Sequence, residues 1–370
     1  MKTSVLYLYL LSVLLMWLTA CQKEDALDVA LFSEEPIRFD VPSILSGVEV
    51  RSLSRAPVDM FPTNGSFGVL GYCLANYDGS TELNPTTGPT PWVSKAVLCT
   101  PHLFYKTEVK YNGTACYYTG QQQRWYEPSD YLYTFLAYYP YSDTYYTVTP
   151  TTQSGIGTPS LTFTMPFSGG DISTPLDIEN IPDAMAAAAI DVTRQEGNVK
   201  LEFNHLLTGI NFTVNNYNQT NDLVIHGLRV SGEFYRSLKI HLSKGLEYPS
   251  ETFKGTFTFL DQNDDSDDVA VEHQKNAIRI GNKSLLLVSN LSQEARPNYI
   301  GNNINIYVDY SFMGKRVNNK EIPLPTGYLP QGGTLYTVEM NFIGDALILN
   351  FVVDNNQVWE NGGDSEIKFE

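Results

Sequence analysis

One stretch of the sequence places oxygen-bearing side chains at the spacing of a calcium loop. Oxygen ligands stand at loop positions one, three, five, seven and twelve, as Asp261, Asn263, Asp265, Asp267 and Glu272. Such a loop turns sharply at a glycine and follows a helix. Here Ser266 stands at the glycine position, and a strand-like stretch, residues 253–260, precedes the loop. The sequence therefore favours a solvated acidic loop over a metal site, with calcium binding as the alternative.

Catalytic signatures are missing from the rest of the chain. The sequence has no HExxH, GxSxG, Walker or strand-following GxGxxG pattern, and no spacing singles out a pair of carboxylates. The histidines are scattered. His205 stands beside Phe203 and Leu206 in an apolar strand pattern, where we expect a satisfied histidine in the core or at a bend. We predict neither enzymatic activity nor a cofactor.

Three cysteines lie beyond the N-terminal region, namely Cys73, Cys99 and Cys116. None stands in a CxxC pair or at metal-ligand spacing from a histidine, so we expect no zinc site. An odd number permits at most one disulfide within the chain. Cys99 and Cys116 could form a disulfide if their strands are neighbours. Each cysteine could equally well be a buried, reduced thiol.

The first residues have the layout of an export signal. Lys2 precedes an apolar run over residues 5–18, which is shorter than the roughly 20 residues of a spanning helix. The sequence Leu-Thr-Ala-Cys at residues 18–21 matches the lipobox of bacterial lipoproteins, in which the cysteine is acylated and the leader is cut just before it. We therefore predict a signal peptide over residues 1–20 and lipidation at Cys21. Residues 22–25 look like a signal for the outer face of the outer membrane, or else form a flexible charged linker.

Composition indicates an acidic, all-β protein. The chain has 41 acidic against 24 basic residues, so it offers no basic surface for nucleic acid. It is rich in strand and turn formers, with 24 Tyr, 18 Phe, 27 Gly and 20 Pro. Strand-like patterns recur at intervals of roughly 8 to 12 residues, which is typical of β-sandwiches.

Two segments stand out from the strand pattern. Residues 36–41 alternate apolar and polar side chains and predict a first, half-buried strand. After it, Arg51 and Arg55 lie in a small, polar, proline-bounded stretch of the kind that proteases cut. Further along, residues 183–190 are helix-prone in isolation, but their flanks favour the end of a strand. A charged turn then places the predicted domain boundary near Gly197.

Seven segments together resemble the fimbrillin family, the building blocks of type V pili in Bacteroidia. Each is weak alone, but they occur in order over nearly the whole chain. They are the lipobox, the strand Arg38-Phe39-Asp40-Val41 followed by Ser54-Arg55-Ala56, and residues 135–140, 183–185, 201–207, 328–336 and 358–363.

This resemblance implies two transthyretin-like Greek-key β-sandwich domains in tandem and a fimbria that serves adhesion. It divides the chain into a signal peptide (1–20), a lipidated propeptide with the first strand (21–55), an N-terminal domain (56–197) and a C-terminal domain (198–370). It also implies an outer-surface location on the outer membrane and, after processing, in the fimbrium. Other fimbrial subunits and an arginine-specific protease are the implied partners, in a homo- or hetero-polymer formed by donor-strand exchange.

Arg55 is the first choice for the processing site because of its Ser-Arg-Ala context, and Arg51 is the second. Arg38, inside the first strand, is the least expected site. The donor strand would come from residues 347–353, and from residues 366–369 as a further choice. Both could equally be resident strands of the C-terminal domain. The role as stalk, tip or anchor subunit stays open.

A different function competes with this one. The chain could be a monomeric surface lipoprotein that binds glycans through exposed aromatic side chains, namely Trp92, Trp125 or Tyr139. For most aromatic residues of such strands we expect core packing instead.

Overall fold

The computed structural model of the 370-residue chain describes fifteen stretches. These are residues 32–44, 61–73, 92, 99–127, 129–167, 175–176, 178–220, 222–241, 245–247, 251–261, 267–273, 277–288, 304–323, 332–344 and 346–353.

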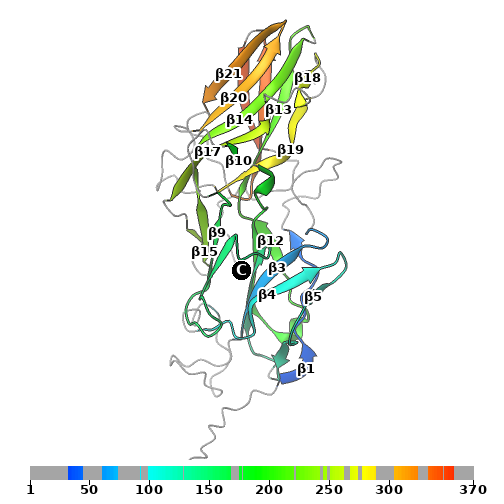
Figure 1. Cartoon of the computed structure of the whole chain (residues 1–370). Helices are drawn as coiled ribbons and strands as arrows, with labels where there is room; N and C mark the ends of the chain where they lie inside the picture. Colours follow the sequence, from blue (N-terminus) through cyan, green and yellow to red (C-terminus); the bar gives the residue numbers. More distant parts are fainter. Residues whose placement is uncertain are drawn as a thin grey trace, which may run out of the picture.

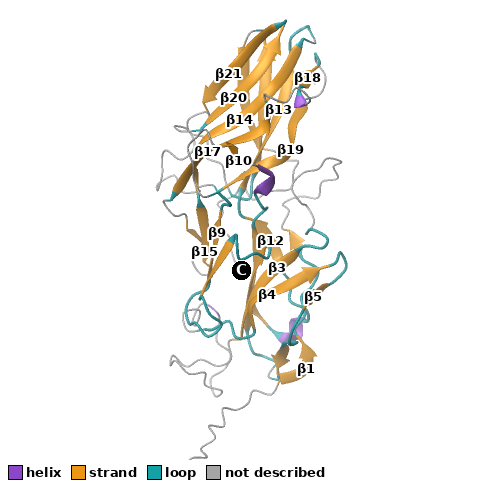
Figure 2. Ribbon diagram, in the orientation of Figure 1, coloured by secondary structure: helices purple, strands orange, loops and turns teal. Residues whose placement is uncertain are grey.

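The molecule is elongated and almost wholly built of strands (Figures 1 and 2). Two short 3-10 helices lie wholly within the described residues, η1 at Ile178–Asn180 and η2 at Arg194–Glu196. None of the described helices has the length and apolar character needed to cross a membrane. The predicted all-β class is thus confirmed.

A seven-stranded sheet forms the centre of one half of the molecule. In spatial order it contains β2 (Ser43–Ile44), β12 (Glu202–His205), β11 (Met185–Val192), β7 (Tyr133–Tyr139), β3 (Ser66–Cys73), β4 (Phe104–Tyr111) and β5 (Cys116–Tyr118). Its middle strands are buried on both faces, which explains their nearly continuous apolar sequence.

Small residues let large aromatic rings pack on these central strands. The alanine-rich stretch is the strand β11, as predicted, and Ala187 pairs with Ala137 of β7. Gly68 of β3 lies under the ring of Tyr138, where an added Cβ would stand 2.1 Å from a ring carbon. A glycine is therefore required at this position by the close approach of the two strands.

The two faces of this sheet are covered differently. One face packs against a four-stranded sheet of β16 (Gly245–Glu247), β15 (Ser237–His241), β9 (Ser160–Thr164) and β8 (Tyr146–Thr149). The other face is covered by residues 37–44 together with a two-stranded sheet of β1 (Phe32–Pro36) and β6 (Arg124–Tyr126). The N-terminal segment is therefore part of a core.

The other half of the molecule is a sandwich of two further sheets (Figure 1). One contains β10 (Pro175–Leu176), β17 (Thr252–Leu260), β14 (Leu223–Tyr235), β20 (Asn305–Phe312) and β21 (Lys315–Pro323), with β18 (Val269–Val271) also paired to β14. The second contains β19 (Ile278–Leu287), β13 (Thr208–Asn216), β22 (Leu335–Ile343) and β23 (Ala346–Val353). Rings from the two sheets meet edge to face, as Phe212 and Phe259 do at 4.8 Å.

Strand pairing crosses the predicted domain boundary near Gly197. β12, which follows that residue, pairs with β11 before it, and β15 pairs with β9. The division of the chain into domains of residues 56–197 and 198–370 therefore stays a prediction.

A buried carboxylate holds three strands of the sandwich together. Asp309 of β20 is fully buried. One of its oxygens accepts a hydrogen bond from the Arg229 guanidinium at 2.8 Å, and the other accepts one from the backbone N–H of Asn319 at 2.7 Å. These partners lie on β14 and β21, so the carboxylate bridges its two neighbouring strands. A buried charge is tolerated only with such partners.

We expect Asp309→Ala to lower the free energy of unfolding by about 3 kcal/mol, because the Arg229 charge would lose its partner inside the sheet. Urea denaturation measures this change. The control Asp130→Ala removes an exposed carboxylate and should stay within about 0.5 kcal/mol of the wild type. Equal stabilities of the two variants would contradict the role given to Asp309.

Candidate functional site: the groove that holds residues 37–44

Residues 37–44 lie in extended form along the edge of the central sheet. The Arg38 carbonyl accepts the Val199 N–H at 2.8 Å, and the Asp40 N–H donates to the Val199 carbonyl at 2.9 Å. Further along, the Ser43 N–H donates to the Leu201 carbonyl at 3.2 Å. These bonds satisfy backbone groups that an edge strand would otherwise leave open.

The predicted first strand over residues 36–41 is displaced in the structure. The regular strands are β1 at Phe32–Pro36 and β2 at Ser43–Ile44, and between them Phe39 forms a single parallel bridge with Val199. The physical reason is a change of partner, because the chain pairs with β6 up to Pro36 and then with the 199–203 stretch. The predicted alternation is present, with Ile37 and Phe39 buried and Arg38 exposed.

The Phe39 ring occupies the centre of an aromatic pocket. Its exposed fraction is 5%, and that of Ile37 is zero. Four rings surround it at edge-to-face angles, with centroid distances of 5.4 Å to Phe104, 5.8 Å to Phe135, 6.2 Å to Phe67 and 6.3 Å to Tyr118. Each such ring pair adds about 0.5 to 1.5 kcal/mol to the burial of the ring itself.

Two side chains of β5 also bind the backbone of this segment. The Tyr118 hydroxyl donates to the Ile37 carbonyl at 3.0 Å, and the Cys116 thiol donates to the Asp40 carbonyl at 3.4 Å. Burial, aided by the negative charge of Asp40, raises the pKa of the Cys116 thiol to about 12. The thiol is therefore protonated at neutral pH and held against the segment.

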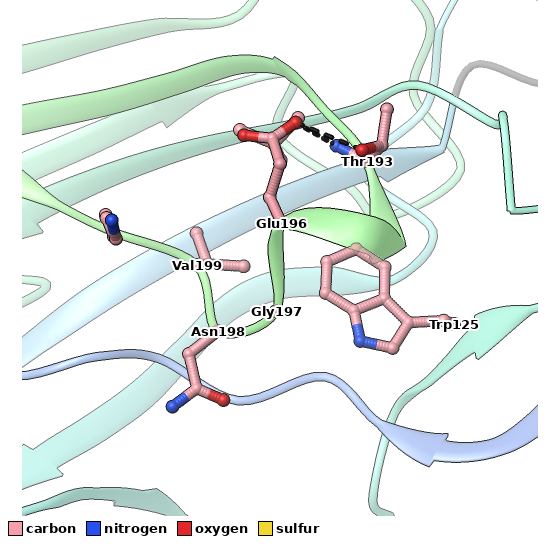
Figure 3. Close-up of a pocket in the computed structure, with 8 residues that line it drawn as sticks. Trp125, Thr193, Glu196, Gly197, Asn198 and Val199 are labelled. Atoms are coloured by element: carbon pink, nitrogen blue, oxygen red, sulfur yellow. Dashed lines mark hydrogen bonds between the residues drawn. The ribbon is translucent and has the colours of Figure 1, made fainter.

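A cavity of about 260 Å³ adjoins this groove. It is lined by Trp125, by Val192 at the end of β11, and by the following residues of the turn between β11 and β12: Thr193, Glu196, Gly197, Asn198, Val199 and Lys200. Figure 3 shows Trp125 beside this turn. The Glu196 carboxylate accepts the backbone N–H of Thr193 at 2.8 Å and its hydroxyl at 3.1 Å, which fixes the turn. This cavity was not predicted from the sequence, although the Thr-x-x-Glu spacing of a capping box was a signal for the turn.

The predicted modification sites are not placed by the structure. Cys21, Arg51 and Arg55 lie outside the described residues. Cys99 and Cys116 are not joined in a disulfide, and Cys116 contacts Asp40 instead.

The predicted calcium loop is only partly placed, since Asn263 and Asp265 lie outside the described residues. Within the described parts of the chain, no group of three potential metal-ligating side chains comes together. The neighbouring Asp268 carboxylate binds His226 Nδ1 at 2.8 Å.

The aromatic side chains that would bind glycans in the alternative function, Trp92, Trp125 and Tyr139, are not exposed as that function requires. Trp92 and Trp125 have exposed fractions of 3% and 1%, because both rings fill the core, and Tyr139 is half-buried. The two tryptophans therefore do not offer the exposed rings that the glycan-binding alternative needs. His205 is buried and bonded to the Asp183 carboxylate at 2.8 Å, which confirms its predicted core role.

We expect Phe39→Ala to lower the free energy of unfolding by about 3 kcal/mol, because it removes the ring that fills the aromatic pocket. Thermal or urea denaturation of the protein measures this loss. The neighbouring side chain of Val41 is 47% exposed, so Val41→Ala is the matched control and should change little. A stable Phe39→Ala variant would show that the segment adds little to the fold.

We also expect slow reaction of Cys116 with a thiol reagent at pH 8, because the raised pKa keeps the thiol protonated. Loosening the segment by Phe39→Ala exposes the thiol to water and lowers its pKa, so the rate should rise about tenfold or more. The measurement uses a Cys21→Ser background, with Cys116→Ser as the blank. A rate that is the same in both proteins would argue against the Cys116 contact.

Comparisons with known proteins gave the following matches. A model of the family described as fimbrillin-like matches residues 86–296. No curated protein matches significantly. Among solved structures, a fimbrial protein of Bacteroides vulgatus is 18% identical with a TM-score of 0.49, and the alignment covers 78% of this chain and 92% of that one.

A fimbrial assembly protein of Parabacteroides distasonis is 12% identical with a TM-score of 0.35, over 80% of this chain and 90% of that one. The decisive finding is the family match, which spans more than half of the 370 residues. The chain therefore belongs to the fimbrillin-like family, and it is a structural protein of the cell surface rather than an enzyme.

Proposed function

We propose that the chain is a fimbrial subunit that is exported as a lipoprotein through Cys21, cut after Arg55 and polymerised by donor-strand exchange for adhesion. The precursor would be anchored to the outer face of the outer membrane. Other fimbrial subunits and an arginine-specific protease are its proposed partners. The family membership supports the fimbrial role, and the groove of residues 37–44 supports the mode of assembly.

The single observation that carries the proposal is the position of this segment. Residues 37–44 complete a core, yet they are joined to the next described stretch, which begins at Phe61, through residues 45–60, which contain Arg51 and Arg55. A cut after Arg55 would separate the segment and Cys21 from the body. The groove would then expose the aromatic pocket and the open backbone groups of Val199, a surface that an added strand can satisfy.

Arg38 is a poor cleavage site by the same geometry. Its side chain is exposed, but its carbonyl is bonded to Val199 and the adjoining residues are buried. A protease must bind its substrate in extended form, so it would first have to pull this stretch out of the groove.

One of the two proposed donor stretches is a resident strand in this structure. Residues 347–353 belong to β23, which pairs antiparallel with β22. Ile343 lies opposite Ala346 at one end of this pairing, and Tyr336 lies opposite Val353 at the other. Within the described residues, β23 is the last strand of its sheet, so its outer edge is open to a further strand. Residues 366–369 are the other choice.

We expect an arginine-specific protease to cut the purified precursor after Arg55 and to start polymerisation, because the cut frees the segment from the body. Denaturing gels without boiling show the polymer ladder, and N-terminal sequencing locates the cut. Arg55→Ala should move the cut to Arg51 or prevent it, whereas Arg38→Ala should leave both cleavage and ladder unchanged. A product that is cut but stays monomeric would overturn donor-strand exchange.

A further inference from the structure

The cavity beside the groove has one wall that offers an unused hydrogen bond. Trp125 of β6 lines this cavity and has an exposed fraction of only 1%. Within the part of the chain that the structure describes, no group accepts a hydrogen bond from its indole N–H. Unlike the N–H of Trp92, this one is not fully enclosed by protein. Figure 3 shows the indole nitrogen on the side of the ring toward Gly197 and Asn198, which also line the cavity, so a bound molecule can accept this hydrogen bond.

The volume of the cavity limits the ligand to a small one. The cavity measures about 260 Å³, close to the roughly 300 Å³ at which small-molecule sites begin. Its mouth carries the exposed residues Glu196, Asn198 and Lys200, and its floor is formed by the buried side chains of Trp125 and Val199. A molecule with a single ring therefore fits, whereas a longer one must extend out through the mouth.

The chemistry of the lining excludes several classes of ligand. Glu196 and Lys200 carry opposite charges, so the lining residues have no net charge with which to favour an ion. One carboxylate is too few to hold a calcium ion. A wholly apolar ligand would leave the Trp125 N–H and the Asn198 amide without partners. The cavity therefore suits a neutral, compact molecule that donates and accepts hydrogen bonds and also has carbon atoms to cover the two valines of the lining.

A pyranose sugar has these properties. The Lys200 ammonium and the indole N–H only donate hydrogen bonds, the Glu196 carboxylate only accepts them, and the Asn198 amide does both. A sugar hydroxyl can face any of these groups, because each hydroxyl is both a donor and an acceptor. The ring carbons of the sugar supply the apolar surface.

The walls of the cavity are held in place without a ligand. The Trp125 ring packs edge to face against Tyr133 at 4.6 Å and against Phe135 at 6.3 Å. Because the ring is buried in this way, a ligand meets its N–H edge and not its faces. The opposite wall is the turn that the bonds from Thr193 to the Glu196 carboxylate fix. A preformed site loses little conformational entropy when its ligand binds.

We propose that this cavity binds one neutral pyranose unit, the terminal residue of a glycan on another surface. The remainder of the glycan leaves past Asn198 and Lys200 at the mouth. The inference deepens the proposed adhesive function and rests on it for the source of the sugar, whereas the site itself is already complete in the uncleaved chain.

The first test uses the uncleaved chain from residue 22 and six free monosaccharides: glucose, galactose, mannose, fucose, N-acetylglucosamine and N-acetylneuraminic acid. Saturation-transfer NMR titrations should show at least one neutral sugar binding with a Kd of about 1 mM or tighter, as expected for a ligand of this size. Trp125→Phe keeps a ring in the core but removes the N–H, and it should weaken binding about fivefold or more.

Trp92→Phe is the matched control, because the Trp92 N–H is enclosed in the core and does not line the cavity. This variant should bind the sugar like the wild type. Three results would overturn the proposal: no binding of any sugar, binding of N-acetylneuraminic acid alone, or equal affinities of Trp125→Phe and the wild type.

A second pair of variants tests the site without disturbing the core. Asn198→Ala removes an exposed amide from the lining and should weaken binding about threefold or more. Gln195→Ala removes an exposed amide of the same turn that lies outside the lining and bonds to Ser129, so it should leave the affinity unchanged. Thermal denaturation checks that both variants fold. Equal affinities of the two variants would contradict the placement of the sugar.

These measurements are separate from those on assembly. If the uncleaved chain binds a sugar but the cleaved chain forms no polymer ladder, fimbrial assembly is refuted and the sugar site stands. If the ladder forms normally but no sugar of the six binds, assembly stands and the sugar site falls.

Discussion

The structure depends on the contact between the Phe39 ring and the open face of the central sheet. That ring closes a pocket of four aromatic side chains that come from separate strands, so one residue near the N-terminus joins parts of the chain up to about a hundred residues away. The backbone bonds to Val199 then fix its register. Without this segment, one face of the sheet would expose apolar rings and unpaired edge groups to water.

The same contact links stability to function. The segment completes a core, and its link to the rest of the chain runs through a stretch with two arginines. In the proposed assembly, cleavage of this link would let another strand replace the segment. The free energy of such an exchange would be small if the entering strand buried side chains equivalent to Ile37 and Phe39. The loss of the detached segment would then drive the proposed assembly.

Much of the local structure could be predicted from the sequence. The aromatic and glycine content indicated strands, and the alternation at residues 37–39 correctly placed two buried side chains around an exposed arginine. The strand assignment of the alanine tract in β11 was right because its flanks outweighed helix propensity, and its small side chains match the bulky ones of neighbouring strands. The burial of Trp92 and Trp125 was not specifically predicted, because a residue's type does not reveal which strand will cover it.

The sequence by itself determined the all-β class and the alternation of buried and exposed side chains at residues 37–39, since each of these is a property of neighbouring residues. Only the tertiary structure decided that Phe39 meets four rings, that Val199 and Leu201 accept the segment, and that β12 and β15 pair across the expected boundary. The physical reason is that strand pairing joins residues far apart in sequence, and local periodicity specifies a strand's faces but not its partner.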